Sequence, residues 1–338
     1  MKIKTIAEMA GVSVSTVSKI LNNYSDVGEE TRKKVLGIME QQGYSPTFSS
    51  THTSNKGRSN LIGVIFAGEF NIEMNHQFFL HVLNMFKKRI GLYGFDLLFF
   101  SNEKQFHHAE KDYLSRCRYF NVDGCVIFAG DDIEHAIHEL DQSDIPCIGI
   151  DLNLKGRNSG HIMTDNTKVS LKVVEHFYLN GYRDIGFIGS SFKSEISRIR
   201  EESFKQALTS FGLPINQEWI INGTDFFENT GYQLMKMMLE QDKLPSAIFA
   251  ASDLLAIGAM RALYEHNLSV PGDMAIIGCD DIDACKYTNP PLTTIRQDHE
   301  KIGLFAAHML FDLINNQIES SSVLVEPEII IRDSCQRR

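Results

Sequence analysis

The feature that most limits what this chain can fold into is a series of short apolar runs that begins after residue 60. Continuous apolar runs bounded by glycine are typical of strands buried on both faces. We expect strands in LIGVIFA, FDLLFF, GCVIFA, CIGI, IGFIG, AIFAA and MAIIG. Amphipathic segments separate them, and we expect helices over residues 77–92, 166–180 and 197–210. This alternation predicts α/β architecture with parallel sheets and helices on each side.

The length of this α/β region predicts two lobes. Residues 61–338 exceed what one such sheet normally needs. Two similar α/β lobes are therefore expected. The segment GVIFAG at 63–68 recurs as CVIFAG at 125–130, which is consistent with repeated strands in one sheet.

The N-terminal residues predict a separate all-α module. Apolar residues at helical spacing precede Gly11, which we expect to end a first helix. Ser13 is placed to cap a second helix, and a third is expected after Val27. Three short helices with a tight turn after the first form a helix-turn-helix module. We expect this headpiece at 1–45, a Ser/Thr-rich linker or hinge at 46–60, and the α/β region at 61–338.

The net charge of −10 is unevenly distributed along the chain. Residues 1–58 carry +3, whereas residues 59–338 carry −13. A polyanion such as DNA can therefore meet the basic headpiece without touching the acidic region.

The sequence predicts a cytoplasmic protein. No apolar run reaches the ~18 residues that a membrane span needs, so we expect no membrane partner. The N-terminus lacks the apolar region of a signal peptide. The six cysteines form no CxxC pair and are expected to be reduced thiols.

Residues 11–22, GVSVSTVSKILN, place four hydroxyl side chains on a predicted helix, although Ser and Thr are mediocre helix formers. The face opposite the apolar positions consists of Val14, Ser15, Ser18 and Asn22. An α-helix fits the DNA major groove, and short hydroxyl side chains allow close approach to bases and phosphates. The alternative is a solvent-exposed helix that happens to be rich in serine.

Short motifs in a fixed order along nearly the whole chain carry a family resemblance. They are TIAEMAGVSVSTVSKILN, VGEETRKKVLGIMEQQGYSP, IPCIGID, GYRDIGFIG, IFAASDLLAIGAM, SVPGDMAIIGCDDID and PPLTTIRQDHEKIG. In this set the chain resembles the lactose/galactose repressor (LacI/GalR) family of bacterial transcription regulators. The resemblance implies a homodimer whose body is periplasmic-binding-protein-like, with two lobes and a small effector in the cleft. It also implies two headpieces that grasp near-palindromic operator DNA.

For DNA, the resemblance implies that Val14 and Ser15 read bases and that Lys19 lies near bases or phosphates. The residues expected to contact mostly the DNA backbone are Ser13, Thr16 and Ser18, and Asn22 lies on the same face. The methyl groups of Val14 suit a thymine methyl. The alternative for Val14 is packing at the helix junction.

The linker departs from the family's habit. Related proteins usually follow Y-x-P with Asn and a hinge helix that carries Ala-Arg and a Leu wedged into the minor groove. Those places hold Thr47, Ser50, Thr51 and Thr53 here, which are weak helix formers. We expect the hinge to be disordered off DNA and Phe48, the large apolar side chain available, to be any minor-groove wedge. The alternative is a protein that bends its operator little.

For the effector, the resemblance aligns Phe78, Asp151, Arg200, Phe226 and Asp280 with positions that line the family's cleft. Carboxylates and a guanidinium between aromatic rings suit a polyhydroxylated ligand. We expect a carbohydrate effector, a sugar or sugar phosphate; the alternative is a purine- or other metabolite-responsive corepressor-type regulator.

Each of these residues also has a structural alternative. Asp280 could cap a helix, Phe226 could belong to the core, and Arg200 could pair with Glu201 or Glu202 at the surface. The family often has Asn-Pro before its paired aromatics, whereas this chain has His76-Gln77. That departure puts the family's pocket wall in doubt here.

No catalytic motif is recognised, because GxSxG, a phosphate loop and HExxH are all missing from the sequence. His107, His108, His135 and His138 fall in polar helical stretches and are expected to be solvated rather than metal ligands. We therefore expect no enzyme, no cofactor and no metal. The other classes weighed are a sugar-processing enzyme or kinase and a solute-binding protein, which would need a signal peptide and no headpiece. Without leucine heptads before the final DSCQRR, we expect a dimer rather than a tetramer.

Overall fold

The computed structural model describes residues 3–21, 27–41, 58–68, 76–101, 113–130, 132–190 and 194–336. The chain divides into two units. One contains residues 1–60 with 121–123, and the other contains residues 61–120 and 124–338. Within the described residues, no helix has the length and apolar character that a membrane crossing requires.

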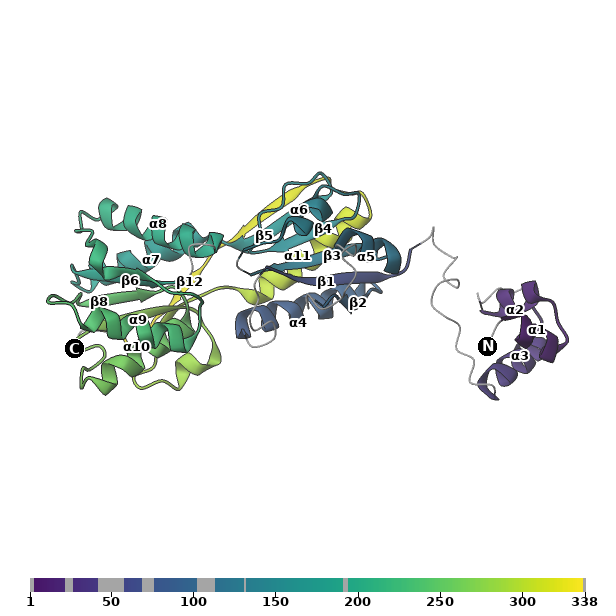
Figure 1. Ribbon diagram of the computed structural model, residues 1–338, viewed down its shortest axis with the longest axis horizontal. Helices are drawn as coiled ribbons and strands as arrows, with labels where there is room; N and C mark the ends of the chain where they lie inside the picture. Colours follow the sequence, from purple (N-terminus) through teal and green to yellow (C-terminus); the bar gives the residue numbers. More distant parts are fainter. Residues whose placement is uncertain are drawn as a thin grey trace. The chain divides into compact units, whose positions relative to one another are not determined.

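The N-terminal unit is built from α1 (Ile3–Ala10), α2 (Val14–Leu21) and α3 (Glu29–Gln41) (Figure 1). Gly11 follows α1 with a φ of +68°, a left-handed conformation that glycine adopts without strain. The Oγ of Ser13 accepts a hydrogen bond from the backbone N–H of Thr16 at 3.0 Å, so the predicted cap of α2 is confirmed. The helices bury one small core, made of Ile6, Ala7, Ala10, Val17, Ile20, Val35 and Met39.

The first lobe of the second unit is built on a parallel sheet in the order β11-β5-β4-β3-β1-β2. Its strands are β1 (Leu61–Ala67), β2 (Asp96–Phe99), β3 (Gly124–Ala129), β4 (Cys147–Ile150), β5 (Ser159–Thr164) and β11 (Ser321–Val325). Its helices are α4 (Gln77–Leu92), α5 (Tyr113–Phe120), α6 (His135–Asp141) and α11 (His299–Ile314). The helices α4 and α11 pack together over one face of this sheet (Figure 1).

The repeated segments noted in the sequence are neighbouring strands of this sheet. Strand β1 pairs in parallel with β3, with Gly63 opposite Cys125 and Ala67 opposite Ala129. Each letter of GVIFA therefore lies beside its counterpart in CVIFA. Matching residues on paired parallel strands point to the same face of a sheet, which explains why the two runs resemble each other.

The second lobe has the sheet order β12-β10-β9-β8-β6-β7, in which β12 runs antiparallel to β10 and the other pairs are parallel. Its strands are β6 (Ile185–Gly189), β7 (Ile220–Asn222), β8 (Ala247–Ala250), β9 (Ala275–Asp280), β10 (Thr293–Arg296) and β12 (Glu328–Ile330). Its helices are α7 (Asn166–Leu179), α8 (Glu195–Ser210), α9 (Glu228–Leu239) and α10 (Asp253–Glu265), with short 3-10 turns η1 (Gln217–Trp219) and η2 (Asp283–Lys286). The pairs α7/α8 and α9/α10 cover opposite faces (Figure 1).

Within the described residues the chain crosses between the lobes three times. The crossings are Asp165 between β5 and α7, residues 297–298 between β10 and α11, and residues 326–327 between β11 and β12. Two of them are joined, because the backbone N–H of Asp165 donates to the carbonyl of Val325 at 2.9 Å. We call these segments the crossing segments. They are the connections between the two lobes within the described residues.

The predicted fold class, a helix-turn-helix headpiece with a two-lobed α/β body, is confirmed. The strands expected at 61–67, 124–129, 147–150 and 185–189 have the observed bounds. The expected helix at 77–92 is α4, and that at 197–210 begins two residues earlier, at Glu195. The strands β5, β7, β10, β11 and β12 were not predicted.

The contact between α9 and α10 gives a test of the second lobe. A Cβ atom added to Gly258 would lie 1.9 Å from the carbonyl oxygen of Glu228. We expect Gly258→Ala to lower the free energy of unfolding by about 2–4 kcal/mol, because the helices must separate. Gly91→Ala in α4 is the matched control, since its Cβ meets no described atom within 4 Å. It should change stability by less than about 1 kcal/mol. Urea unfolding measures both, and equal effects would contradict the close approach.

Candidate functional site

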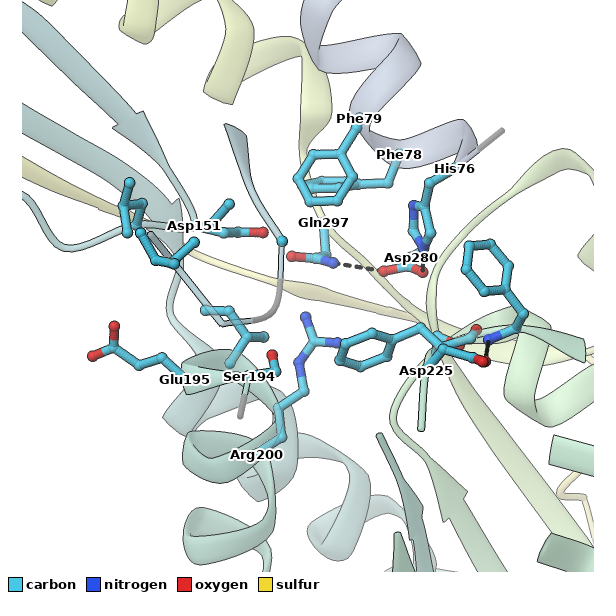
Figure 2. A pocket seen from close by; sticks show the side chains of 18 of the residues that line it. His76, Phe78, Phe79, Asp151, Ser194, Glu195, Arg200, Asp225, Asp280 and Gln297 are labelled. Atoms are coloured by element: carbon cyan, nitrogen blue, oxygen red, sulfur yellow. Dashed lines mark hydrogen bonds and ion pairs between the residues drawn. The ribbon is translucent and has the colours of Figure 1, made fainter. Parts of the chain in front are cut away.

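A cavity of about 180 Å³ lies between the two lobes and is lined by residues of both. We call it the interlobe cavity (Figure 2). Ala129 ends β3 and Gly130 follows it, Asp151 follows β4, and Asp280 ends β9, so the lining comes from the carboxyl ends of parallel strands. This edge is where ligands bind in open α/β sheets, because the loops and helix N-termini converge there.

Arg200 is the central cation of the interlobe cavity. Its side chain projects from α8, is only 3% exposed and points into the cavity (Figure 2). Its Nε donates to Oδ1 of Asn166 at 2.7 Å, and its Nη1 donates to the carbonyl of Ala251 at 2.6 Å. Asn166 directly follows the crossing residue Asp165, so the guanidinium links the cavity to a crossing segment.

Two carboxyl groups, those of Asp151 and Asp280, line the same cavity. Both residues have positive φ, +55° for Asp151 and +130° for Asp280, a strained backbone that is common at functional sites. Burial raises the pKa of Asp151 to about 7, against the opposing effect of Arg200. Burial also raises the pKa of Asp280, which accepts a hydrogen bond from Nε2 of Gln297 at 2.6 Å.

His76 reaches from the first lobe to the second. It occupies the N-cap position of α4, and its Nε2 lies 3.9 Å from Oδ2 of Asp280. Burial, and then the charge of Arg200, lower the pKa of His76 to about 4. The imidazole is therefore neutral near pH 7, and its contact with Asp280 is not an ion pair. Its ring lies 5.4 Å from that of Phe79 and 6.2 Å from that of Phe227, measured between centroids.

Aromatic side chains form apolar walls on both sides of the cavity. Phe78 and Phe79 come from the first turn of α4 and pack edge to face at 5.1 Å. Phe226 and Phe227 come from the loop between β7 and α9. The hydroxyl of Ser252, which caps α10, donates to the carbonyl of Phe226 at 2.8 Å and holds this loop.

The structure places all five residues expected at the effector site around this cavity, namely Phe78, Asp151, Arg200, Phe226 and Asp280. The surface alternative for Arg200 is wrong, because Arg200 is buried and the partners of Glu201 are Lys205 and Asn222. Asp280 ends a strand and does not cap a helix. Phe226 is half-buried against the core of its lobe and also faces the cavity.

Sequence reasoning did not assign Gln297 or Ser252, and it noted His76 only as a departure from the family. Gln297 lies in a crossing segment directly after β10, and Ser252 follows β8. The signal for Gln297 was missing because β10 was not predicted, whereas Ser252 directly follows the predicted strand AIFAA, and this position was the available signal. His135 and His138 are exposed on α6, and His107 and His108 lie outside the described residues.

The second candidate site is the outer face of α2. Val14 is 43% exposed, which argues against packing at the helix junction, and Ser15 and Lys19 are also exposed. The Oγ of Ser13 shares hydrogen bonds with the hydroxyls of Ser15 at 2.7 Å and Thr16 at 2.8 Å. Ser18 is half-buried. Asn22, Phe48 and the hinge positions Thr47, Ser50, Thr51 and Thr53 lie outside the described residues.

Comparisons with known proteins agree on one family. The sequence model for "Bacterial regulatory proteins, lacI family" matches residues 2–47, and that for "Periplasmic binding protein-like domain" matches residues 174–335. The HTH-type transcriptional repressor PurR of Actinobacillus pleuropneumoniae serotype 3 (strain JL03) is 30% identical over 335 residues, 98% of this chain and 97% of that protein.

Two solved structures are similar over most or all of the chain. The lac repressor dimer bound to operator and the anti-inducer ONPF is 25% identical, with a TM-score of 0.81, and the match covers 100% of this chain and 99% of that one. A LacI-family transcriptional regulator from Enterococcus faecium with bound ribose is 27% identical, with a TM-score of 0.69, over 82% and 98% of the two chains.

These features together define a bacterial transcription regulator with a DNA-binding headpiece and a two-lobed ligand-binding body. The chain belongs to the lacI family of bacterial regulatory proteins, as a DNA-binding transcriptional repressor. Regulators of this family bind operator DNA and small-molecule effectors as dimers, and the lac repressor is a dimer on its operator.

The raised pKa of Asp151 predicts a pH dependence of stability. The folded chain holds this proton more tightly than the unfolded chain, whose carboxyl has a pKa near 3.8. The contribution of Asp151 to the stability of the wild type is therefore lost as the pH rises from about 4 to about 7. Asp151→Asn has no proton to lose at this position. Across that pH range its free energy of unfolding should therefore rise by about 2–4 kcal/mol relative to that of the wild type.

Urea unfolding of both proteins between pH 4.5 and 8 measures this difference, and Asp242→Asn, at an exposed carboxylate, is the matched control. Taking the difference between the wild type and the variant removes the contributions of titrating groups that both proteins share. A difference that stays constant with pH would contradict the raised pKa.

Proposed function

We propose that this repressor binds a small carbohydrate effector in the interlobe cavity and that this binding controls its affinity for a near-palindromic operator. The observation that carries the proposal is the convergence of Arg200, Asp151 and Asp280 between phenylalanine rings. Carboxylates and a guanidinium form paired hydrogen bonds to neighbouring hydroxyls, and the aromatic rings cover the C–H faces of a sugar. The repressor acts as a homodimer in the cytoplasm.

The control follows from where the ligand binds. A ligand in the interlobe cavity contacts both lobes and therefore favours one arrangement of them over others. The crossing segments transmit this preference, because they are the connections between the lobes. In a dimer, a change in one lobe alters the spacing of the two headpieces, and this couples effector affinity to operator affinity.

On DNA, α2 enters the major groove. Val14 and Ser15 contact base edges, Lys19 lies near bases or phosphates, and the hydroxyls of Ser13, Thr16 and Ser18 contact mostly the sugar-phosphate backbone. Asn22 adds a contact on the same face. Phe48 is the side chain that wedges into the minor groove. Binding decreases steeply with salt, since the basic headpiece displaces counterions from phosphates.

The four phenylalanines favour a second candidate effector. Phe78 and Phe79 on one side, with Phe226 and Phe227 on the other, can stack against a flat heterocycle as well as a sugar. A purine that acts as a corepressor is therefore the alternative. A thermal-shift screen of sugars and purines separates the two, because a ligand at 100 times its Kd stabilises the folded chain by ~2.7 kcal/mol.

Variants of the two sites should separate the two binding functions. Arg200→Ala and Asp280→Ala should abolish the effector response and leave operator binding nearly unchanged, because the headpiece folds around its own core. Arg198→Ala is the matched control, since it removes the same charge from an exposed position on α8. Calorimetry with the compound that stabilises the wild type measures effector binding. Undiminished affinity in both cavity variants would overturn the assigned site.

Variants of the headpiece test the assignment of the DNA-binding residues. Replacing Val14 and Ser15 together should change which duplex is preferred, and Lys19→Ala should weaken binding by about tenfold and reduce its salt dependence. Fluorescence anisotropy on operators selected from random duplexes by each protein measures this. If the double variant selects the wild-type operator, α2 does not read bases through these two positions.

A further inference from the structure

Three polar atoms in the wall of the interlobe cavity have no hydrogen-bond partner among the described residues. They are Nδ1 of His76, Oδ1 of Asp151 and Oε1 of Gln297. The three side chains reach the cavity from α4, from the end of β4 and from a crossing segment (Figure 2). Buried polar atoms are nearly always paired, and a group of unpaired ones around one cavity indicates the places where a ligand binds.

Two of these atoms, Oε1 of Gln297 and Nδ1 of His76, are hydrogen-bond acceptors in this arrangement, and Oδ1 of Asp151 accepts when its carboxyl group is ionised. The amide of Gln297 donates through Nε2 to Asp280, which leaves Oε1 as an acceptor. The carboxylate of Asp280 faces Nε2 of His76, and this favours the tautomer with its proton on Nε2. Nδ1 of His76 then carries a lone pair. A matching ligand must supply several O–H or N–H donors, whereas phosphate and carboxylate groups add acceptors.

The charges of the cavity also favour a ligand without phosphate or carboxylate groups. Among its described lining residues are three buried or half-buried carboxyl groups, of Asp151, Asp225 and Asp280, and one guanidinium, of Arg200, whereas the side chain of Glu195 is exposed. The charge of Arg200 already stabilises the ionised forms of Asp151 and Asp280. Two of its nitrogens also donate to protein oxygens. The positive charge of Arg200 is thus already shared by the carboxyl groups of Asp151 and Asp280. An anionic ligand would add a further negative charge beside it.

We propose that the interlobe cavity selects an uncharged effector rich in hydroxyl donors and rejects its phosphorylated and carboxylated counterparts, with Nδ1 of His76 accepting one of its hydroxyls. This proposal rests on the proposed function, because it narrows the chemical class of that effector. It separates sugars from sugar phosphates, which the sequence left together, and it also excludes uronates. His76 is a specificity-determining residue for this ligand.

The first experiment compares matched sugars on the full chain by thermal shift and calorimetry. The probes are a panel of neutral monosaccharides and disaccharides, together with the 6-phosphate and the uronate of each hexose. We expect stabilisation by neutral sugars, with the charged counterpart of any binder at least about tenfold weaker. A phosphate or uronate that binds more tightly than its parent overturns the proposal. A panel in which no sugar binds, neutral or charged, overturns both this proposal and the carbohydrate effector.

The second experiment tests the charge argument without knowledge of the effector. Inorganic phosphate is added to the wild type and to Asp151→Asn/Asp280→Asn, each with and without Arg200→Gln, and sodium chloride at equal ionic strength is the control. We expect no Arg200-dependent stabilisation of the wild type and a clear one in the Asp→Asn protein. Arg200-dependent stabilisation of the wild type by phosphate overturns the charge argument. If the double variant does not fold, Asp151→Asn alone replaces it.

The two experiments distinguish failure of the selection against anions from failure of the carbohydrate effector. If phosphate behaves as expected and no sugar binds, the cavity excludes anions and the carbohydrate effector is wrong. If sugars bind and phosphate also stabilises the wild type through Arg200, the proposed function stands and the selection against anions is wrong.

The third experiment tests His76 directly. His76→Phe keeps a ring of similar size and removes the Nδ1 acceptor, so we expect about a tenfold loss of affinity for the neutral sugar that binds the wild type best. His76→Asn, which restores an acceptor, should recover part of this loss, and operator affinity without sugar should not change. Gln77→Ala, at the exposed neighbouring position, is the matched control. Unchanged affinity in His76→Phe overturns the role of His76.

Discussion

The interaction on which the ligand-binding body depends is the buried guanidinium of Arg200. It donates hydrogen bonds to Asn166 at the start of α7 and to the carbonyl of Ala251 directly after β8, and its charge acts on the two carboxyl groups of the cavity. A buried charge is stable only when its hydrogen bonds and counter-charges are arranged around it. The same residue therefore fixes the local structure of the second lobe and the charge that a ligand meets.

The position of Asn166 connects this interaction to regulation. Asn166 follows the crossing residue Asp165, whose backbone is hydrogen-bonded to Val325 beside a second crossing segment. Gln297, in the third crossing segment, donates to Asp280. A ligand that changes the hydrogen bonds of Arg200 or Asp280 therefore acts close to all three crossing segments. The DNA-binding helix belongs to a separate unit with its own core, which allows its recognition surface to differ from that of the cavity in charge and chemistry.

Much of the fold could be predicted because the central strands are continuous apolar runs. Strands β1, β3, β4 and β6 have no polar interruption and were found with their observed bounds. Strand β10, TTIR, was not predicted, because it begins with two polar residues, Thr293 and Thr294. Both are fully buried, and they hydrogen-bond to Ser334 and Asp253, which are distant in sequence. Edge strands β11 and β12 are half exposed and short, so their apolar pattern is weak.

The site was predictable to a lesser extent. The family resemblance led to five residues of the cavity wall, but residue patterns alone left Arg200 on a polar helix beside Glu201 and Glu202. Only the packing of α8 against Asn166 and Ala251 shows that this arginine is buried. The approach of His76 to Asp280 joins two lobes across more than two hundred residues of sequence, and no local pattern reports such a contact.

One guanidinium, that of Arg200, is shared by two buried carboxyl groups in the interlobe cavity, and we expect no further anion to bind there. The most direct measurement is a carboxyl-carbon NMR titration of the full chain labelled at aspartate, with Asp151→Asn used to assign the resonance. We expect Asp151 to titrate near pH 7 in the wild type and at higher pH in Arg200→Gln, where the cation that favours its ionised form has been removed. An Asp151 resonance that titrates near pH 4, or that does not respond to Arg200→Gln, would contradict it.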